Sequence, residues 1–426
     1  MNEFDKELIL RLDALRKQGL YRELRRITSP QSPRIQLAGR TLLNFSSNDY
    51  LGLANHPALK CAAIAALERY GAGAGASRLI CGSLTPHEEL DETIAGFKDT
   101  QAAVSFSTGY AAALGTICAL LGKDDVIILD KLVHASIVDG ARLSGAKPRI
   151  FPHNDLNKLE NILKWSRRRA RNTEHGTRVL IVTESVFSMD GDHAPLREIV
   201  ELKEKYGAWL MVDEAHATGL YGANNRGLAE ELGVSDRIEV QMGTLGKAFG
   251  ASGGYICSSR ALADYLVNRA RTFIFSTAPP PSAAAAAAAG IRFVQSAAGN
   301  ERRNLLWQRV AELESKIIPL RAGQKSKIPS AIIPIIIGDE TRAMEASTAL
   351  REQGFLIPAI RYPSVARGQA RLRVTLTASH TPADIAALIQ ALSLVPGLPP
   401  VTCHTSPVTE HATRNSQLAT RNTASA

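Results

Sequence analysis

The stretch Trp209-Leu210-Met211-Val212-Asp213-Glu214-Ala215-His216 begins with a short apolar run and ends in two carboxylates and a histidine. Such a run is typical of a buried strand, and a carboxylate directly after it lies at the strand end where α/β proteins bind ligands. Further short apolar runs alternate with longer helical stretches. These are Ala102–Phe106, Val126–Leu129, Val179–Val182, Glu239–Met242 and Gly254–Cys257. The pattern predicts an α/β fold with a mostly parallel sheet covered by helices on both faces.

The chain divides into four parts. They are an N-terminal helix and short strand segment (1–45), a large domain (46–290), a smaller α+β C-terminal domain (291–396) and a disordered tail (397–426). Leucines spaced among charges predict an amphipathic helix over residues 4–27, and a strand pair is expected over Ile35–Phe45 with Gly39 at its turn. The alanine run Ala283–Ala289 predicts a helix start. Strands of the smaller domain are expected at Ala331–Ile337 and Ala370–Leu376.

The composition is that of a folded globular protein, with 426 residues of which 45% are hydrophobic and 21% charged. No apolar run reaches the roughly 18 residues of a membrane helix, and the N-terminus has no apolar signal segment. The five cysteines are scattered and form no C-x-x-C pair. We therefore expect a cytoplasmic protein that has no metal site and does not contact a membrane.

A nucleic-acid-binding ATPase is the hypothesis from a different class, because the net charge is +9 and Asp213–His216 spells a helicase box. That box needs a phosphate loop, yet Gln241 and Ala248 stand where the loop requires glycine and serine or threonine. The basic run Arg167–Arg171 is typical of a solvated helix end, and only 5% of the residues are aromatic. The sequence disfavours nucleic acid as a partner.

A glycine-rich loop, Gly243-Thr244-Leu245-Gly246-Lys247-Ala248-Phe249-Gly250, follows another apolar run. A lysine that forms a Schiff base needs room for a flat ring and surroundings that lower its pKa, and the glycines supply that room. The alternative without a catalytic role is a glycine-rich loop that carries an exposed lysine.

Three more polar segments follow predicted strands. Ser105–Tyr110 opens a helix, whose first backbone N–H groups suit a phosphate, although Ser107 or Thr108 as a plain helix cap is an equal alternative. His134 could stack on an aromatic ligand or be structural, and Val186–Asp192 follows a further strand. Together with Asp213 and Lys247, these segments supply what pyridoxal phosphate needs, namely a lysine, a carboxylate and a phosphate cup.

Several long motifs, in the same order, resemble those of the α-oxoamine synthases, which are fold-type I pyridoxal-phosphate enzymes. The resemblance covers about residues 4–396. The motifs are Asn44–Leu53, Ser77–Leu79, His134–Ser136, Val186–Asp192, Val212–His216, Gly243–Gly250, Ile274–Thr277 and Arg371–Arg373. The resemblance implies a large domain on a mostly parallel sheet of the seven-stranded type and a smaller α+β C-terminal domain.

The resemblance also implies roles toward the cofactor. Lys247 would hold it by a Schiff base, Asp213 would pair with the pyridine nitrogen, and His134 would stack on the ring. Ser188 and His216 would contact the region of the phenolic oxygen.

The phosphate end would be shared between subunits. Gly109, Tyr110 and Thr244 would hold the cofactor, the glycine through its backbone N–H to the phosphate. Ser276 and Thr277 would reach the phosphate of the neighbouring subunit, which implies a homodimer with shared active sites.

For the substrate, the resemblance implies that Arg373 pairs with the amino-acid carboxylate and that Asn48 and Ser77 line the same site. Arg25, placed in the predicted N-terminal helix, stands where relatives contact the acyl substrate, with Arg22 and Arg26 as close alternatives.

The implied reaction is a decarboxylative condensation of an amino acid with an acyl thioester, in which Lys247 also removes the Cα proton. The letters of Ser77–Leu79, Phe187–Leu196 and Arg271–Thr277 favour L-alanine with pimeloyl-CoA or a pimeloyl carrier protein, giving 8-amino-7-oxononanoate for biotin synthesis. Gly243–Ala248 and Gly253–Tyr255 fit equally well the members that join glycine to acetyl-CoA.

Three positions depart from the common pattern, namely Ala113, Glu214 and Ala217. They leave the cofactor roles intact but bear on the choice of substrate. A relative that has lost the condensing activity is a third hypothesis, which the presence of Lys247, Asp213 and Arg373 does not support.

Overall fold

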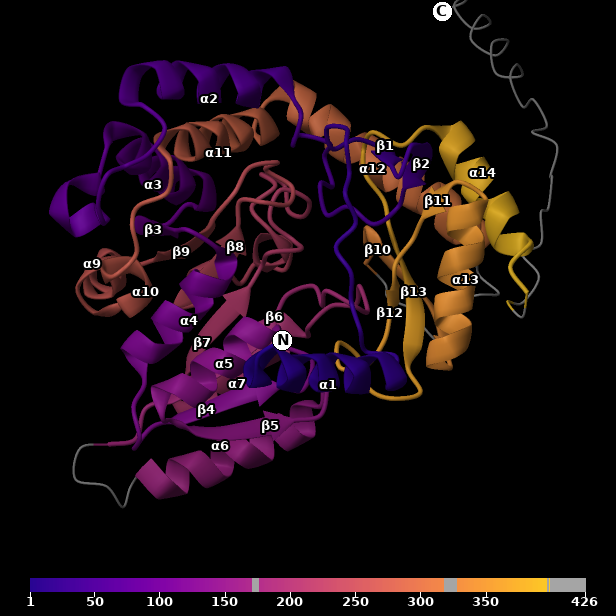
Figure 1. Ribbon diagram of the computed structural model, residues 1–426. Coiled ribbons are helices and arrows are strands. Elements are labelled where there is room, and N and C mark those ends of the chain that lie inside the picture. The colour runs from indigo at the N-terminus through magenta and orange to yellow at the C-terminus, as the bar shows by residue number, and fades with distance from the viewer. Residues whose placement is uncertain (171–175, 318–327, 397, 399–426) are drawn as a thin grey trace, which may run out of the picture.

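The computed structural model describes residues 1–170, 176–317, 328–396 and 398, and it is built around one seven-stranded sheet (Figure 1). In spatial order the strands are β3 (Ala102–Phe106), β9 (Gly254–Ser258), β8 (Val240–Thr244), β7 (Trp209–Asp213), β6 (Val179–Glu184), β4 (Val126–Asp130) and β5 (Lys147–Phe151). Only β9 in this sheet runs antiparallel to its neighbours. The predicted fold, a mostly parallel sheet in an α/β protein, is confirmed.

Helices bury both faces of this sheet. Side chains alternate along β4, so Val126 and Ile128 belong to one hydrophobic cluster and Ile127 and Leu129 to the other. The first cluster includes residues of α2 (Pro57–Tyr70), α3 (Thr85–Lys98), α6 (Leu156–Ala170), α7 (Leu196–Tyr206), α8 (Leu228–Glu231) and α11 (Pro281–Val294). The second includes residues of α4 (Gly109–Leu120), α5 (Ala135–Ser144), α9 (Arg260–Arg269) and α10 (Arg271–Ile274). Continuous apolar runs are therefore needed in the central strands, as predicted.

Two small sheets complete the described fold. One contains β10 (Ile332–Gly338), β13 (Ala370–Thr375) and β12 (Ala359–Ile360). The other contains β1 (Arg34–Leu37), β2 (Arg40–Asn44) and β11 (Phe355–Leu356). The associated helices are α12 (Ala297–Lys316), α13 (Glu340–Glu352) and α14 (Pro382–Ser393). Because β2 pairs in parallel with β11, the N-terminal strands share a sheet with the C-terminal part of the chain.

The local predictions hold at several elements. The hairpin of β1 and β2 turns at Gly39, whose φ is +76°, and the alanine run lies inside α11. The short helical segments η1 (Arg78–Gly82) and η2 (Ser235–Arg237) were not predicted. The predicted disordered tail (397–426) lies outside the described residues, except for residue 398.

The N-terminal helix is shorter than the predicted span of residues 4–27. Helix α1 covers Glu3–Lys17, where Gln18 N–H donates to the carbonyl of Ala14 and Gly19 follows with φ +66°. Glycine adopts this left-handed conformation without steric cost, so the helix stops there. The placement of Arg25 in this helix was therefore wrong.

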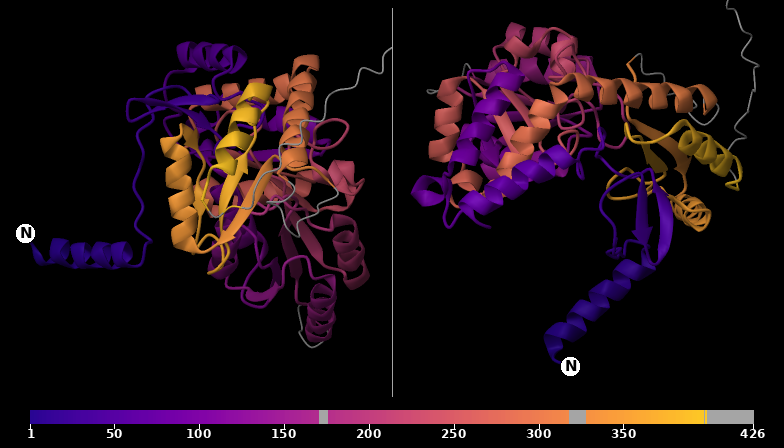
Figure 2. Two further views of the ribbon diagram at one scale, coloured as in Figure 1. Left: turned by 90° about the vertical axis from the view of Figure 1, so that its right-hand side faces the viewer. Right: turned by 90° about the horizontal axis from the view of Figure 1, so that it is seen from above.

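Helix α1 extends away from the rest of the chain (Figure 2), and none of its residues is buried. Among the described helices, none combines the length and the apolar character needed to span a lipid bilayer.

A buried ion pair joins α3 to the segment after β7. The side chain of Lys98 is 2% exposed and donates to Glu214, which is 0% exposed and also accepts from the N–H of Ala229. Lys98 donates in addition to the carbonyl of Arg226. Glu214, which departs from the family pattern, is thus fully engaged in holding the fold.

We expect that replacing Lys98 with Met lowers the free energy of unfolding by about 3–5 kcal/mol, because the buried carboxylate of Glu214 then lacks its counter-charge. Urea unfolding followed by circular dichroism measures the change. Lys164→Met is the matched control, because the ion pair of Lys164 with Glu160 is at the surface, where solvent screens it and it contributes little to stability.

The double variant Lys98→Met, Glu214→Gln should recover most of the lost stability, since the amide can still accept from Ala229 without an unpaired charge. A loss below about 1 kcal/mol in the single variant would contradict a stabilising role for this pair.

Candidate active site

Three parallel strands end in polar side chains at one edge of the sheet. Glu184 ends β6 and is the register partner of Asp213, which ends β7, while Thr244 ends β8. Lys247 follows Thr244 by three residues in the loop after β8. The strand order thus brings together side chains that are up to 63 residues apart in the chain.

The amine of Lys247 lies in a low-dielectric position. Burial lowers its pKa to about 8, helped by the charge of Arg373, while the carboxylates of Asp213 and Glu184 oppose the decrease. Lys247 Nζ and His216 Nε2 are 2.8 Å apart and share a hydrogen bond. The lysine is therefore held in place by its neighbour and is easily deprotonated.

His216 links Lys247 to Tyr50. Its Nδ1 lies 2.5 Å from the Tyr50 hydroxyl, and both side chains are buried. Burial lowers the pKa of His216 well below its usual value, and burial raises the pKa of Tyr50 to about 12. A neutral imidazole has one donor and one acceptor. When Lys247 is protonated it donates to Nε2, so Nδ1 carries the ring hydrogen and donates to the Tyr50 hydroxyl.

Arg373 on β13 continues the network. Its Nη2 donates to Asn48 Oδ1 at 3.1 Å, and that oxygen lies 3.5 Å from the Tyr50 hydroxyl. Its Nε donates to the carbonyl of Ser188 at 2.7 Å, and its Nη1 donates to Thr375 Oγ1 at 3.0 Å. These bonds hold the guanidinium in place, and its hydrogen bond and charge also act on Tyr50, where they oppose the rise in pKa that burial causes.

The lysine loop is pressed against the segment that carries Tyr50 and Asn48. Gly250 has φ +66°, and a Cβ there would lie 2.4 Å from the carbonyl carbon of Leu53. Only glycine permits this approach, which places the segment before Leu53 beside Lys247.

The two carboxylates differ in their partners. Asp213 Oδ1 accepts from the N–H of Ala215 at 2.9 Å, and Glu184 Oε2 accepts from the N–H of Ser188 at 3.3 Å. Burial raises the pKa of both. Within the described part of the chain, Glu184 Oε1 has no hydrogen-bond partner.

His134 begins α5, where its Nδ1 accepts from the N–H of Ser136 at 3.3 Å. Burial lowers its pKa, while the charge of Asp213 raises it and that of Lys247 lowers it again. The His134 ring thus caps a helix, which is the structural role considered from the sequence. It is also a neighbour of the Asp213 and Lys247 charges.

The start of α4 lies against Thr244. Thr108 caps this helix by accepting from the N–H of Ala111 at 3.0 Å, so the plain-cap alternative is correct for Thr108. A Cβ at Gly109 would lie 2.5 Å from Thr244 Cγ2, and the buried Thr244 Oγ1 lacks a partner among the described residues. Tyr110 is half exposed and donates to Asp139. The N-terminus of α4 therefore lies beside the Thr244 hydroxyl, and both groups suit an anion.

The other predicted residues lie apart from this network. Ser77 pairs with Thr277 in an isolated antiparallel bridge, next to Ser276 and to Phe275, which is 69% exposed. Arg25 is near Arg351, whose charge adds to burial in lowering the Arg25 pKa.

Sequence reasoning missed Tyr50, Glu184 and Thr375 as members of the network. Tyr50 lies inside the Asn44–Leu53 motif, and Glu184 ends a predicted strand, so position alone could have indicated both. Thr375 gives no comparable signal, because its contact depends on the Arg373 rotamer.

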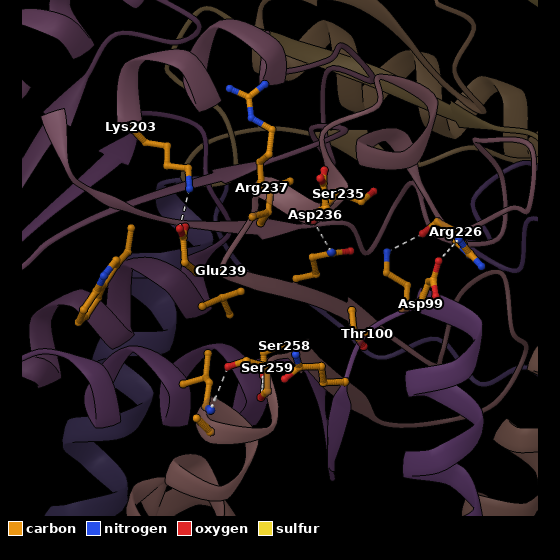
Figure 3. A pocket seen from close by; sticks show the side chains of 18 of the residues that line it. Asp99, Thr100, Lys203, Arg226, Ser235, Asp236, Arg237, Glu239, Ser258 and Ser259 are labelled. Carbon is orange, nitrogen blue, oxygen red and sulfur yellow. Dashed lines mark hydrogen bonds and ion pairs between the residues drawn. The ribbon is translucent and has the colours of Figure 1, made fainter. Parts of the chain in front are cut away.

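A cavity of about 1160 Å³ lies at the opposite edge of the sheet, where β7 and β8 begin (Figure 3). It contains none of the predicted site residues. Each lysine or arginine that lines it is paired with a carboxylate, as Figure 3 shows for Lys203 with Glu239 and Arg226 with Asp99. The remaining pairs are Lys98–Glu214, Arg178–Asp125 and Arg237–Glu204. The cavity therefore offers an anion no unpaired cation from these side chains.

Comparison with known proteins agrees with the geometry at the carboxyl edge. A family model described as aminotransferase class I and II matches residues 40–392. The 8-amino-7-oxononanoate synthase of Anaeromyxobacter sp. strain Fw109-5 is 49% identical over 389 residues, which are 91% of this chain and 95% of the relative. The synthase of Anaeromyxobacter sp. strain K is 47% identical over 390 residues, again 91% of this chain and 95% of the relative.

Among solved structures, serine palmitoyltransferase from S. paucimobilis, in complex with pyridoxal phosphate and myriocin, gives a TM-score of 0.83 at 31% identity. The match covers 92% of this chain and 97% of that one. Because the family model spans most of the sequence and these likenesses extend over nearly all of it, the chain belongs to the aminotransferase class I and II family and to its α-oxoamine synthase branch.

Proposed function

We propose that this protein is a pyridoxal-phosphate-dependent acyltransferase that condenses L-alanine with pimeloyl-CoA or a pimeloyl carrier protein, giving 8-amino-7-oxononanoate for biotin synthesis. The observation that supports it best is the continuous network from Lys247 through His216, Tyr50 and Asn48 to Arg373. It joins an amine that deprotonates easily to a guanidinium that suits a carboxylate. The relatives that bear the name of this enzyme are 47% and 49% identical to the chain.

The side chains at the carboxyl edge fit pyridoxal phosphate. The orphaned hydroxyl of Thr244 and the N-terminus of α4 at Gly109 suit a phosphate group. Asp213 suits a protonated pyridine nitrogen, and His134 next to it suits the ring face. Lys247, with its lowered pKa, suits the aldehyde.

When bound, pyridoxal phosphate stabilises negative charge on the carbon that carries the substrate amino group. Arg373 binds the substrate carboxylate through its guanidinium, which Ser188, Thr375 and Asn48 hold in place, and so fixes the direction in which the Cα–H bond points. Lys247, as a neutral amine, removes the Cα proton, and its bond to His216 holds Nζ toward that proton. Asp213 would pair with the pyridine nitrogen and help to keep it protonated.

The proposed assembly is a homodimer in the cytoplasm. Ser276 and Thr277 adjoin a surface with Ile80 79% exposed and Phe275 69% exposed, which a second copy of the chain would cover. We place the two domains at residues 46–290 and 291–396, with the site between them. Cys61, Cys81, Cys118 and Cys257 are free thiols, which agrees with a reducing compartment.

The pH dependence of cofactor capture follows from the pKa of Lys247, because only the unprotonated amine adds to an aldehyde. With a pKa of about 8, the rate at which the apo-protein binds pyridoxal phosphate should rise about tenfold per pH unit below pH 8 and level off above it. Stopped-flow absorbance in the visible range measures this rate.

An ordinary lysine, with a pKa near 10.4, would give a rate that keeps rising to about pH 10, and that profile would contradict the lowered value. Lys247→Ala should show no visible absorbance change at any pH. Lys60→Ala, an exposed lysine of α2, is the matched control and should behave as the wild type.

The substrate assignment is tested with a matrix of product masses. The protein with pyridoxal phosphate is given alanine, glycine or serine, each against pimeloyl-, acetyl-, succinyl- and palmitoyl-CoA. We expect a decarboxylated condensation product from alanine with pimeloyl-CoA alone.

Product from glycine with acetyl-CoA would instead move the enzyme to the other branch that the loop motifs fit, with the fold and residue roles unchanged. A protein that forms no product from any pair, including pimeloyl carrier protein with alanine, would refute the condensing activity.

A further inference from the structure

The segment Val186–Asp192 lies between the large sheet and the small sheet of β10, β13 and β12. Its turn is closed by a bond from Gly191 N–H to the Phe187 carbonyl at 2.8 Å. Gly191 has φ +67°, and a Cβ there would lie 2.2 Å from the carbonyl oxygen of Ile332 on β10. The segment therefore rests directly on the strand that pairs with β13, where Arg373 is located.

His153 holds this segment from the side of the large sheet. Its Nδ1 lies 3.0 Å from Asp130 Oδ1 and its Nε2 lies 2.7 Å from Asp192 Oδ2. The Phe187 ring stands edge-on to the imidazole, with the ring centres 4.3 Å apart. Both ring nitrogens face carboxylate oxygens, and an imidazolium can donate to both of them, while Asn154 Nδ2 lies 3.2 Å from Nε2.

Electrostatics agree with this geometry. Burial is the largest single influence and lowers the pKa of His153, but hydrogen bonds and charges from Asp130 and Asp192 together raise it to about 10. The Asp130 side chain is 0% exposed, so its charge has little solvent to screen it. His153 thus joins a buried carboxylate at the end of β4 to the far end of the segment.

Arg371 holds the same segment from the side of the small sheet. It forms an ion pair with Asp190 and donates to the Met189 carbonyl at 3.4 Å. Arg371 and Arg373 are two residues apart on β13 and so lie on one face of the strand. Arg373 Nε donates to the Ser188 carbonyl, directly before Met189 in the same turn of the segment.

We propose that His153 is a positioning residue for the amino-acid substrate. By fixing Asp192 against Asp130, it sets the Ser188 carbonyl at the place where that carbonyl orients Arg373, so that the guanidinium of Arg373 meets the substrate carboxylate. His153 does not itself touch the substrate. This inference rests on the proposed function, in which Arg373 binds that carboxylate.

If His153 only stabilised the fold, its loss would not affect the binding of one substrate more than the other. A positioning role predicts a selective effect. Asn48 and Thr375 still hold Arg373 when the segment shifts, so Arg373 should be misaligned and not lost from the site. Misalignment of this kind weakens the binding of the amino acid and leaves the acyl thioester, which does not need Arg373, unaffected.

The test is His153→Ala in the holoenzyme, with steady-state kinetics for both substrates. We expect KM for alanine to rise about tenfold and KM for pimeloyl-CoA to stay within about twofold. Arg178→Ala is the matched control, because Arg178 pairs with the buried Asp125 at the start of β4, as His153 pairs with Asp130 at its end. It should lose thermal stability with both KM values unchanged.

The inference is overturned if His153→Ala leaves KM for alanine unchanged, or if both KM values rise in parallel. Should that variant fail to fold, Asp190→Asn releases the segment from the Arg371 side and should give the same split between the two KM values. Nitrogen NMR of histidine-labelled wild-type protein adds an independent readout, and a neutral His153 at pH 8 would also overturn it.

Arg373→Lys separates this inference from the proposed function. If it leaves KM for alanine unchanged, the carboxylate role of Arg373 is wrong, and the proposed function needs revision. If it raises KM for alanine and His153→Ala does not, only the positioning role of His153 is wrong.

Discussion

A buried amine at the ends of three parallel strands is the constraint on which the other features of the site depend. Lys247 loses hydration there, and this loss together with the nearby charge of Arg373 lowers its pKa to about 8. Asp213 and Glu184 prevent a larger decrease. The register of β6 and β7 sets these two carboxylates side by side, so the parallel pairing itself places the two charges that limit the decrease in the lysine pKa.

The same constraint explains why residues from the N-terminal segment enter the site. A neutral hydrogen-bonding neighbour suits Lys247, since another positive charge beside it would lower the pKa of Lys247 still more. His216 meets this need because burial keeps it uncharged, and Tyr50 supplies its second hydrogen bond. Tyr50 reaches that position only because Gly250 lets the lysine loop touch the backbone at Leu53. One glycine thus joins the loop after β8 to the segment after β2.

Much of the fold could be predicted from the sequence, because central strands of a covered parallel sheet must be apolar throughout. The edge strand β5 escaped prediction since it reads Lys147-Pro148-Arg149-Ile150-Phe151, and an edge strand tolerates charges and proline. The end of α1 was misjudged because Leu24, which is exposed, continues the apolar spacing of the α1 leucines past Gly19. Lys247, Asp213, His216 and Arg373 could be proposed as neighbours in one site because each belongs to a local motif. His153 could not, since its importance arises from Asp130 and Asp192, which are brought to it only by the folded chain.

The Asp-Glu-Ala-His letters at residues 213–216 show how the fold decides the use of a motif. Side chains of successive residues leave an extended strand in opposite directions, so Asp213 and Glu214 at the end of β7 enter different surroundings. Asp213 lies among the groups around Lys247, whereas Glu214 accepts from Lys98 through one oxygen and from Ala229 through the other. The Glu214 carboxylate is 0% exposed and paired with Lys98, so it is not open to a nucleotide-bound metal ion. The letters that suggested an ATPase therefore divide here into one residue for the site and one for the stability of the sheet that supports it.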